Sequence, residues 1–114
     1  MLPLQALAEY GADTKQGLMR CMNQEAFYLK LVRMAVSDTQ WGKLRPLIES
    51  GSSREAFEIA HSLKGVYGNL ALTPLYEPIS ELTERLRNGE PTDVDPVLTK
   101  LEQAAETLRK RTEE

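Results

Sequence analysis

The residues with the clearest chemical potential stand in AHSLKGVYGN, residues 60–69, which contain the only histidine of the chain. Lys64 follows His61 three positions later, and two glycines, Gly65 and Gly68, come next. A neutral imidazole, the form that dominates at pH 7, is a nucleophile that can form a covalent intermediate. If it acquired a phosphoryl group, a lysine one helical turn away would supply a compensating positive charge. This combination predicts nucleophilic group transfer at a helix surface.

The positions of these residues around a helix indicate that the histidine faces solvent. With about 100° of rotation per residue, Lys64, Gly65 and Gly68 all lie within about 60° of His61. The opposite side carries five apolar residues, Ala56, Ile59, Leu63, Val66 and Leu70. Because that apolar side must face a core, we expect Val66 to point inward and His61 outward.

The two glycines indicate that a partner protein approaches this face. An interior glycine costs a helix about 1 kcal/mol relative to alanine. Close packing of a neighbouring helix is the usual reason for one, but both Gly65 and Gly68 flank the outward His61. We therefore expect them to leave room for another protein above the imidazole.

Four further residues border this stripe and are candidate partner contacts. Phe57, one turn before His61, could be an exposed docking anchor or could pack against the N-terminal helix. Arg54 and Glu58 are expected to be solvated charges that adjust docking. Tyr67 lies about 120° from His61, where it could pack at the helix boundary or narrow the choice of partner.

The rest of the chain is expected to form helices that position this one. Helix-type periodicity and end signals predict one or two short N-terminal helices within residues 3–22, followed by four long helices. The long helices are expected at about 24–50, 52–71, 74–88 and 94–112. Because the links between them are short, the pattern predicts an all-α, antiparallel four-helix bundle that forms a single domain.

The first long helix is the least regular of the four. Its apolar stripe consists of Phe27, Leu31, Met34, Trp41, Leu44 and Ile48. A break is expected at Asp38 and Thr39, and a kink or restart near Pro46, which has no backbone N–H to donate. The core, rather than a cofactor site, is expected to hold Met19, Met22, Met34 and Trp41.

Composition and charge exclude several classes of protein. The chain has 114 residues, 41% apolar and 27% charged, with a net charge of −3, which is typical of one soluble folded domain. The mild acidity argues against a nucleic-acid binder, which would usually show a basic stripe. No apolar run approaches the roughly 20 residues that a membrane span needs. Cys21 is the only cysteine and the start lacks the basic region of a signal peptide, so we expect a cytoplasmic protein. The sequence shows no obvious additional dimerisation surface, so we expect a monomer. No metal-ligand set accompanies the lone histidine.

The histidine motif resembles the signature of histidine-containing phosphotransfer (HPt) domains. The matching residues are His-Ser-Leu-Lys-Gly at 61–65, preceded by Ala60 and followed by Gly-Asn-Leu at 68–70. The lead-in YGADTKQGLMRCMNQEAFYLKLV, residues 10–32, is also similar to that of the family: an aspartate, then Gly-Leu-x-Arg, then an aromatic before an apolar helix. The resemblance covers nearly the whole chain.

The resemblance implies a role in two-component phosphorelays. It implies that His61 is phosphorylated, that Lys64 assists the phosphoryl group, and that Gly65 and Gly68 make room for the partner. The implied partners are response-regulator receiver domains, whose aspartates donate and accept the phosphoryl group, and a hybrid sensor histidine kinase. The family has no kinase activity of its own, and the Mg²⁺ that the transfer requires belongs to the receiver, so no cofactor is implied for this chain.

Three residues depart from the family pattern, and two other functions stay open. Val66 and Tyr67 stand where small residues are usual, and Ala71 stands where glycine is common. One alternative is the phosphoacceptor domain of a chemotaxis-type or hybrid sensor kinase, which a longer reading frame with an ATPase or receiver domain would favour. The other is a helical adaptor that binds a receiver domain without phosphotransfer.

Overall fold

The computed structural model describes residues 3–88 and 93–113, and every regular element among these residues is helical. The elements in chain order are α1 (Leu4–Tyr10), α2 (Thr14–Arg20), α3 (Glu25–Ser37), the short 3-10 helix η1 (Gln40–Lys43), α4 (Leu44–Glu49), α5 (Ser53–Asn69), α6 (Thr73–Arg87) and α7 (Asp95–Glu113). Within the described ranges, none of these helices has both the length and the apolar character needed to cross a membrane.

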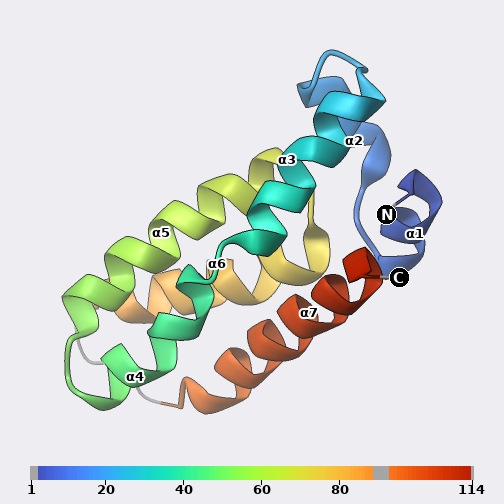
Figure 1. The fold of residues 1–114 in the computed structure, drawn as a ribbon. Helices are drawn as coiled ribbons and strands as arrows, with labels where there is room; N and C mark the ends of the chain where they lie inside the picture. Colours follow the sequence, from blue (N-terminus) through green and yellow to red (C-terminus); the bar gives the residue numbers. More distant parts are fainter. Residues whose placement is uncertain (1–2, 89–92, 114) are drawn as a thin grey trace.

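The long helices close into a four-membered bundle around one core. Helix α5 packs against α6, α6 against α7, and α7 against α3, while α4 and η1 complete the ring against α5 (Figure 1). The bounds of α5, α6 and α7 fall within two residues of those expected from the sequence. The predicted all-α bundle is therefore confirmed, with α1 and α2 added at its N-terminal side.

The first long helix is not the continuous element expected over 24–50. Helix α3 ends at Ser37. The next residue, Asp38, has an extended backbone, and its Oδ1 accepts a hydrogen bond from the amide of Gln40 at 2.9 Å. Helix α4 then restarts, with Pro46 as its third residue, where no intrahelical N–H donor is required. The break at Asp38 and the restart near Pro46 follow the sequence signals.

The apolar stripe expected along this element is only partly buried. Leu44 lies in the core and Leu31, Trp41 and Ile48 pack against it, but the fully buried face of α3 is a different one from that expected. The buried residues of α3 are Tyr28 and Val32, each with no exposed surface, whereas Phe27 and Met34 are exposed. Both faces of α3 carry apolar residues at helical spacing, so periodicity alone does not select between them. The methionines expected in the core also lie at the surface, with exposed fractions of 57% for Met19, 73% for Met22 and 59% for Met34.

Tyr28 joins three helices at one end of the bundle. Its hydroxyl donates a hydrogen bond to the carbonyl oxygen of Leu70 at 2.8 Å, which satisfies both groups inside the core. A Cβ at Gly17 of α2 would lie only 2.4 Å from Cε1 of this ring, so the ring occupies the space that the glycine leaves. Desolvation by burial is the main cause that raises the pKa of Tyr28 to about 12.

Helix α5 ends in a turn that also holds the N-terminal segment. The amide of Leu72 donates to the carbonyl of Tyr67 and the amide of Ala71 to that of Gly68, at 3.0 and 3.1 Å, which is the Schellman pattern. Ala71 adopts the left-handed conformation with φ of +54°. Its carbonyl accepts a hydrogen bond from the amide of Asp13 at 2.9 Å, so this turn fixes the start of α2.

Replacing Ala71 with glycine is expected to stabilise the protein by about 0.5–1 kcal/mol. The left-handed conformation costs an L-residue roughly 1–2 kcal/mol, and glycine avoids this cost but loses more backbone entropy on folding. Urea denaturation measures the change. Ala8→Gly, at an exposed position inside α1, is the matched control and should instead destabilise by about 1 kcal/mol. A loss of stability in Ala71→Gly would contradict the strain assigned to this turn.

Candidate functional site

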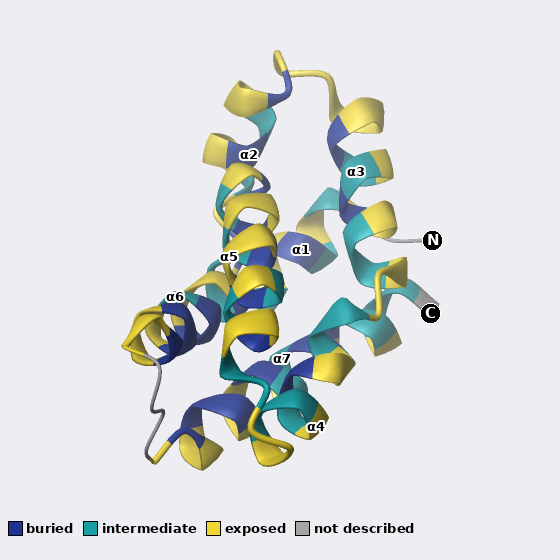
Figure 2. Ribbon diagram, turned by 90° about the vertical axis from the view of Figure 1, so that its left-hand side faces the viewer, coloured by how far each residue is buried: buried dark blue, intermediate teal, exposed yellow. Residues whose placement is uncertain are grey.

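His61 lies on the outer face of α5 with an exposed side chain. Figure 2 shows this helix with its exposed residues turned away from the bundle and its buried residues turned toward the core. The bundle therefore does not enclose the imidazole, and its nitrogens are open to a reactant in solution.

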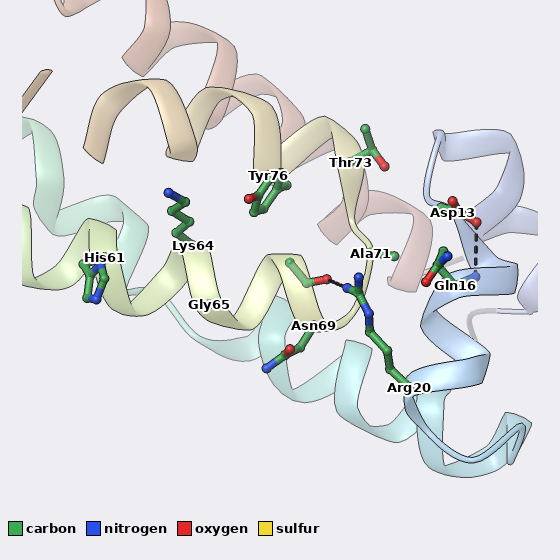
Figure 3. A pocket seen from close by; sticks show the side chains of 11 residues that line it. Asp13, Gln16, Arg20, His61, Lys64, Gly65, Asn69, Ala71, Thr73 and Tyr76 are labelled. Atoms are coloured by element: carbon green, nitrogen blue, oxygen red, sulfur yellow. Dashed lines mark hydrogen bonds between the residues drawn. The ribbon is translucent and has the colours of Figure 1, made fainter. Parts of the chain in front are cut away.

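A surface groove of about 720 Å³ runs from His61 toward the N-terminal segment. Its lining comes from α5, α2 and the start of α6, and consists of Asp13, Gln16, Arg20, His61, Lys64, Gly65, Gly68, Asn69, Ala71, Thr73 and Tyr76. Figure 3 shows His61 at one end of this row and Asp13 at the other, with Tyr76 reaching in from α6. The volume of the groove lies in the range of ligand-binding clefts.

The groove carries more positive than negative side chains. Lys64 lies one turn after His61 on α5, and Arg20 extends from α2 to donate a hydrogen bond from Nη1 to the carbonyl of Gly68 (Figure 3). Because that acceptor is neutral, it does not cancel the charge of the guanidinium. The single carboxylate in the lining is Asp13, which caps α2 by accepting the amide of Gln16 at 3.1 Å. The arrangement suits an arriving anionic group.

The two glycines of the motif have different surroundings. A Cβ built at Gly65 has no atom within 4 Å other than its own local helix, so open space lies above this residue. A Cβ at Gly68 would lie 3.0 Å from Cε1 of Tyr76. The open space at Gly65 agrees with the expectation that this glycine leaves room for a partner protein. At Gly68 the space is filled by Tyr76 of α6, so this glycine instead has the usual role of allowing a neighbouring helix to pack closely.

The buried arc of α5 is rotated from its expected position. Val66, expected to point inward, is 39% exposed, whereas Tyr67 is only 2% exposed. The expectation that Tyr67 contacts a partner is therefore wrong. The buried residues are Ala56, Ala60, Leu63, Tyr67 and Leu70, centred roughly 40° from the predicted arc.

Packing against α6 explains this rotation. The side of α5 that carries Phe57, Lys64 and Gly68 is half-buried, whereas the side that carries Gly65 and Val66 is exposed. Helix α6 packs against the first side, so the buried residues of α5 lie closer to that side than an isolated helix would suggest. Burial then raises the pKa of the Tyr67 phenol above its ordinary value.

Phe57 adopts neither of the arrangements expected from the sequence. It is half-buried, and its ring stacks on the imidazole of His61 with 5.8 Å between the ring centroids and 12° between the planes. The guanidinium carbon of Arg87, at the end of α6, lies 5.1 Å from the centre of the same phenyl ring. Phe57 is therefore not a free anchor, because its ring contacts the histidine of its own helix and a cation of α6 and packs against the core.

The two charged residues predicted near the site are exposed. Arg54 and Glu58 form an ion pair with 3.9 Å between Nε and Oε1, and their side chains are 95% and 68% exposed. A pair so exposed contributes little to stability. Both residues therefore remain accessible to a partner.

Sequence reasoning did not assign several residues of the groove to the site, among them Asp13, Arg20 and Tyr76. The sequence carries a signal for two of them, because Asp13 and the arginine of Gly-Leu-x-Arg belong to the lead-in that resembles that of the family. Nothing in the sequence places Tyr76 over Gly68, since their proximity depends on how α6 packs on α5. Within residues 3–88 and 93–113, no group of three or more His, Cys, Asp or Glu side chains is arranged to hold a metal ion.

Comparison with known protein families identifies this architecture. The family model described as Hpt domain matches residues 32–111, which is more than two thirds of the chain and includes His61, Lys64 and both glycines of the motif. Searches of the curated proteins and of the solved structures found no match. The match covers η1, α4, α5 and α6, the C-terminal part of α3 and most of α7. The chain therefore belongs to the Hpt domain family, the histidine phosphotransfer modules of phosphorelays.

Proposed function

We propose that His61 accepts a phosphoryl group from an aspartyl phosphate on one receiver domain and passes it to an aspartate on another. The observation that carries this proposal is the exposed imidazole on α5, next to open space above Gly65. Family membership supports histidine phosphotransfer in a phosphorelay. The assignment of the reaction to His61 rests on its being the only histidine of the chain.

The transfer is a displacement at phosphorus. The lone pair of an unprotonated ring nitrogen of His61 forms the N–P bond, while the P–O bond to the receiver carboxyl breaks and its electron pair leaves with the carboxylate. The proton on the other ring nitrogen stays in place during this step. In the return step, a carboxylate of the second receiver attacks phosphorus and the ring nitrogen leaves with its electron pair.

The chain's own contribution is positioning and a modest electrostatic effect. Lys64 and Arg20 place positive charge along the groove that receives the phosphoryl group. Because both lie at a solvated surface, their effect is screened and supports the reaction without dominating it. We assign the Mg²⁺ and most of the charge stabilisation to the receiver, since the groove offers only one carboxylate, Asp13.

The docking surface is proposed to centre on the exposed side of α5. Gly65 allows a receiver helix or loop to approach the helix backbone, and Arg54 and Glu58 lie exposed on the same face. A hybrid sensor kinase would supply the first phosphorylated receiver.

The direct test is to incubate the purified chain with phosphorylated receiver domains from the same genome and to measure acid-labile phosphate on it. Rapid transfer from at least one receiver, and onward to a second, is the expected result. Tight receiver binding without any transfer would replace the proposal with the adaptor function. Phosphate that arrives only from an ATP-dependent kinase, and from no receiver, would favour the kinase phosphoacceptor role.

Replacing Gly65 with leucine is expected to weaken receiver binding by about tenfold or more, equivalent to at least about 1.4 kcal/mol. The leucine fits the free chain because nothing lies within 4 Å of its Cβ, but it fills the space that the receiver would use. Isothermal titration with an unphosphorylated receiver measures the change. Gly42→Leu, also in open space but on η1, is the matched control and should leave the affinity unchanged. Equal affinities for both variants would remove Gly65 from the interface.

A further inference from the structure

Three side chains form a continuous contact that ends at His61. The rings of Phe57 and His61 lie nearly parallel, with 12° between their planes and 5.8 Å between their centroids. The guanidinium carbon of Arg87 lies 5.1 Å from the centre of the phenyl ring. Arg87 is itself held by Glu84, with 3.3 Å between Nη2 and Oε1. The imidazole is thus connected through Phe57 to the C-terminal turn of α6.

The stack restricts an otherwise free side chain. An exposed histidine on a helix can exchange between staggered rotamers, and only some of them present a given ring nitrogen to an incoming group. Aromatic rings with centroids 4.5–7 Å apart in an offset arrangement attract each other, which favours the stacked rotamer by roughly two- to tenfold. His61 therefore spends more of its time in one orientation than an isolated surface histidine would.

Arg87 fixes the ring on which the imidazole rests. A guanidinium over a phenyl face is attracted to the electrons of the ring, and this attraction persists at a partly exposed site. Phe57 is half-buried at the edge of the core, which further limits its motion. The support for the imidazole therefore comes from α6 as well as from α5.

We infer that Phe57 is a positioning residue for His61, held in turn by Arg87, and that it acts on the rate of phosphoryl transfer rather than on receiver affinity. The inference rests on the proposed function, in which a ring nitrogen of His61 attacks phosphorus. Such a displacement needs the nitrogen aligned with the breaking bond, so a smaller population of the aligned rotamer slows the step in proportion.

The test compares Phe57→Leu, which removes the ring and keeps an apolar side chain, with Phe57→Tyr, which restores a ring. Phe27→Leu is the matched control, because Phe27 is the other phenylalanine of the chain and is 42% exposed on α3. For each variant, single-turnover transfer at saturating phosphorylated receiver gives the rate, and titration with unphosphorylated receiver gives the affinity. Proton NMR of the imidazole reports the stack directly, since a phenyl ring shifts the resonances of protons above its face.

Phe57→Leu is expected to slow the single-turnover step by about three- to tenfold with unchanged receiver affinity, and to remove the ring-current shift of the imidazole protons. Phe57→Tyr should keep both the transfer rate and the ring-current shift of the unmodified chain. Arg87→Met should show a partly reduced rate and a partly reduced shift. Phe27→Leu should resemble the unmodified chain in every measurement.

The outcomes separate this inference from the proposed function. Imidazole resonances that do not move in Phe57→Leu would show that the stack is absent in solution and would overturn the inference. A lost shift with an unchanged transfer rate, or weaker receiver binding in place of a slower step, would overturn it as well. If the unmodified chain accepts no phosphate from any receiver, the proposed function fails, whether or not the NMR experiment detects the stack.

Discussion

Replacing His61 with glutamine is expected to abolish phosphoryl transfer to this chain while leaving the fold intact. Glutamine can occupy the same exposed position on α5 and donate hydrogen bonds, but its amide nitrogen is not a nucleophile. Because no other histidine is present, no second imidazole can replace it. The rate of acid-labile phosphate formation should fall by on the order of 10³-fold or more.

Two measurements keep this result interpretable. Thermal unfolding of His61→Gln should stay close to that of the unmodified chain, since the residue is exposed and the substitution removes only its stack with Phe57, worth about 0.5–1.5 kcal/mol. Receiver affinity should also stay within a few-fold, which shows that the docking surface is intact. Acid-labile phosphate that persists on the variant would remove His61 from its proposed role.

The second large effect is on stability, where Gly17→Ala is expected to destabilise the protein by about 2–4 kcal/mol. The new Cβ would lie 2.4 Å from Cε1 of Tyr28, a distance that requires the ring to move. Tyr28 has no exposed surface and its hydroxyl bonds to Leu70, so moving it strains the core and breaks a buried hydrogen bond. Urea denaturation followed by helical circular dichroism measures the loss.

A matched pair and a double variant identify the cause. Gly65→Ala, the same substitution in open space within α5, should instead stabilise by about 1 kcal/mol, because alanine is the better helix former. In a Tyr28→Leu background, Gly17→Ala should lose most of its cost, because the ring that it strikes is gone. A penalty that persists in that background would place the effect of Gly17 elsewhere than at Tyr28.

The fold was predictable from the sequence wherever local signals decide the structure. The break at Asp38 and the restart near Pro46 each depend on backbone hydrogen bonding within a few residues, and each is present in the structure. The exposed position of His61 was also predictable, because an apolar arc must face the core. These features need no knowledge of how the helices pack on one another.

The wrong predictions concern which face of a helix is buried, because that depends on how the helix packs against its neighbours. Helix α3 has apolar residues on two faces, and the buried face is the one whose Tyr28 can reach Leu70 and fill the space at Gly17. The predicted arc of α5 was centred correctly for an isolated helix, but α6 covers one flank of it and buries Tyr67 in place of Val66.

The candidate site divides in the same way. The chemistry of His61 and Lys64 could be predicted from residue type and spacing, because both lie on one helix. Three other features of the site are contacts between different helices. Tyr76 packs over Gly68, Arg87 lies over the ring of Phe57, and Arg20 donates a hydrogen bond to the carbonyl of Gly68. Helical periodicity shows which residues share a face of one helix, but it does not show which residues of two different helices come into contact.

The hydrogen bond from Arg20 to the carbonyl of Gly68 has a consequence for how specificity can evolve. Asp13 and Arg20 line the groove, yet both precede residue 32, where the match to the family model begins. The helix that carries His61 and one wall of the groove are thus encoded in separate stretches of the gene. Under the proposed function, substitutions at the exposed residues Gln16 and Arg20 are expected to alter which receiver fits while His61 and the core contact of Gly17 with Tyr28 stay unchanged. Duplicated copies of such a chain could then diverge into insulated signalling routes.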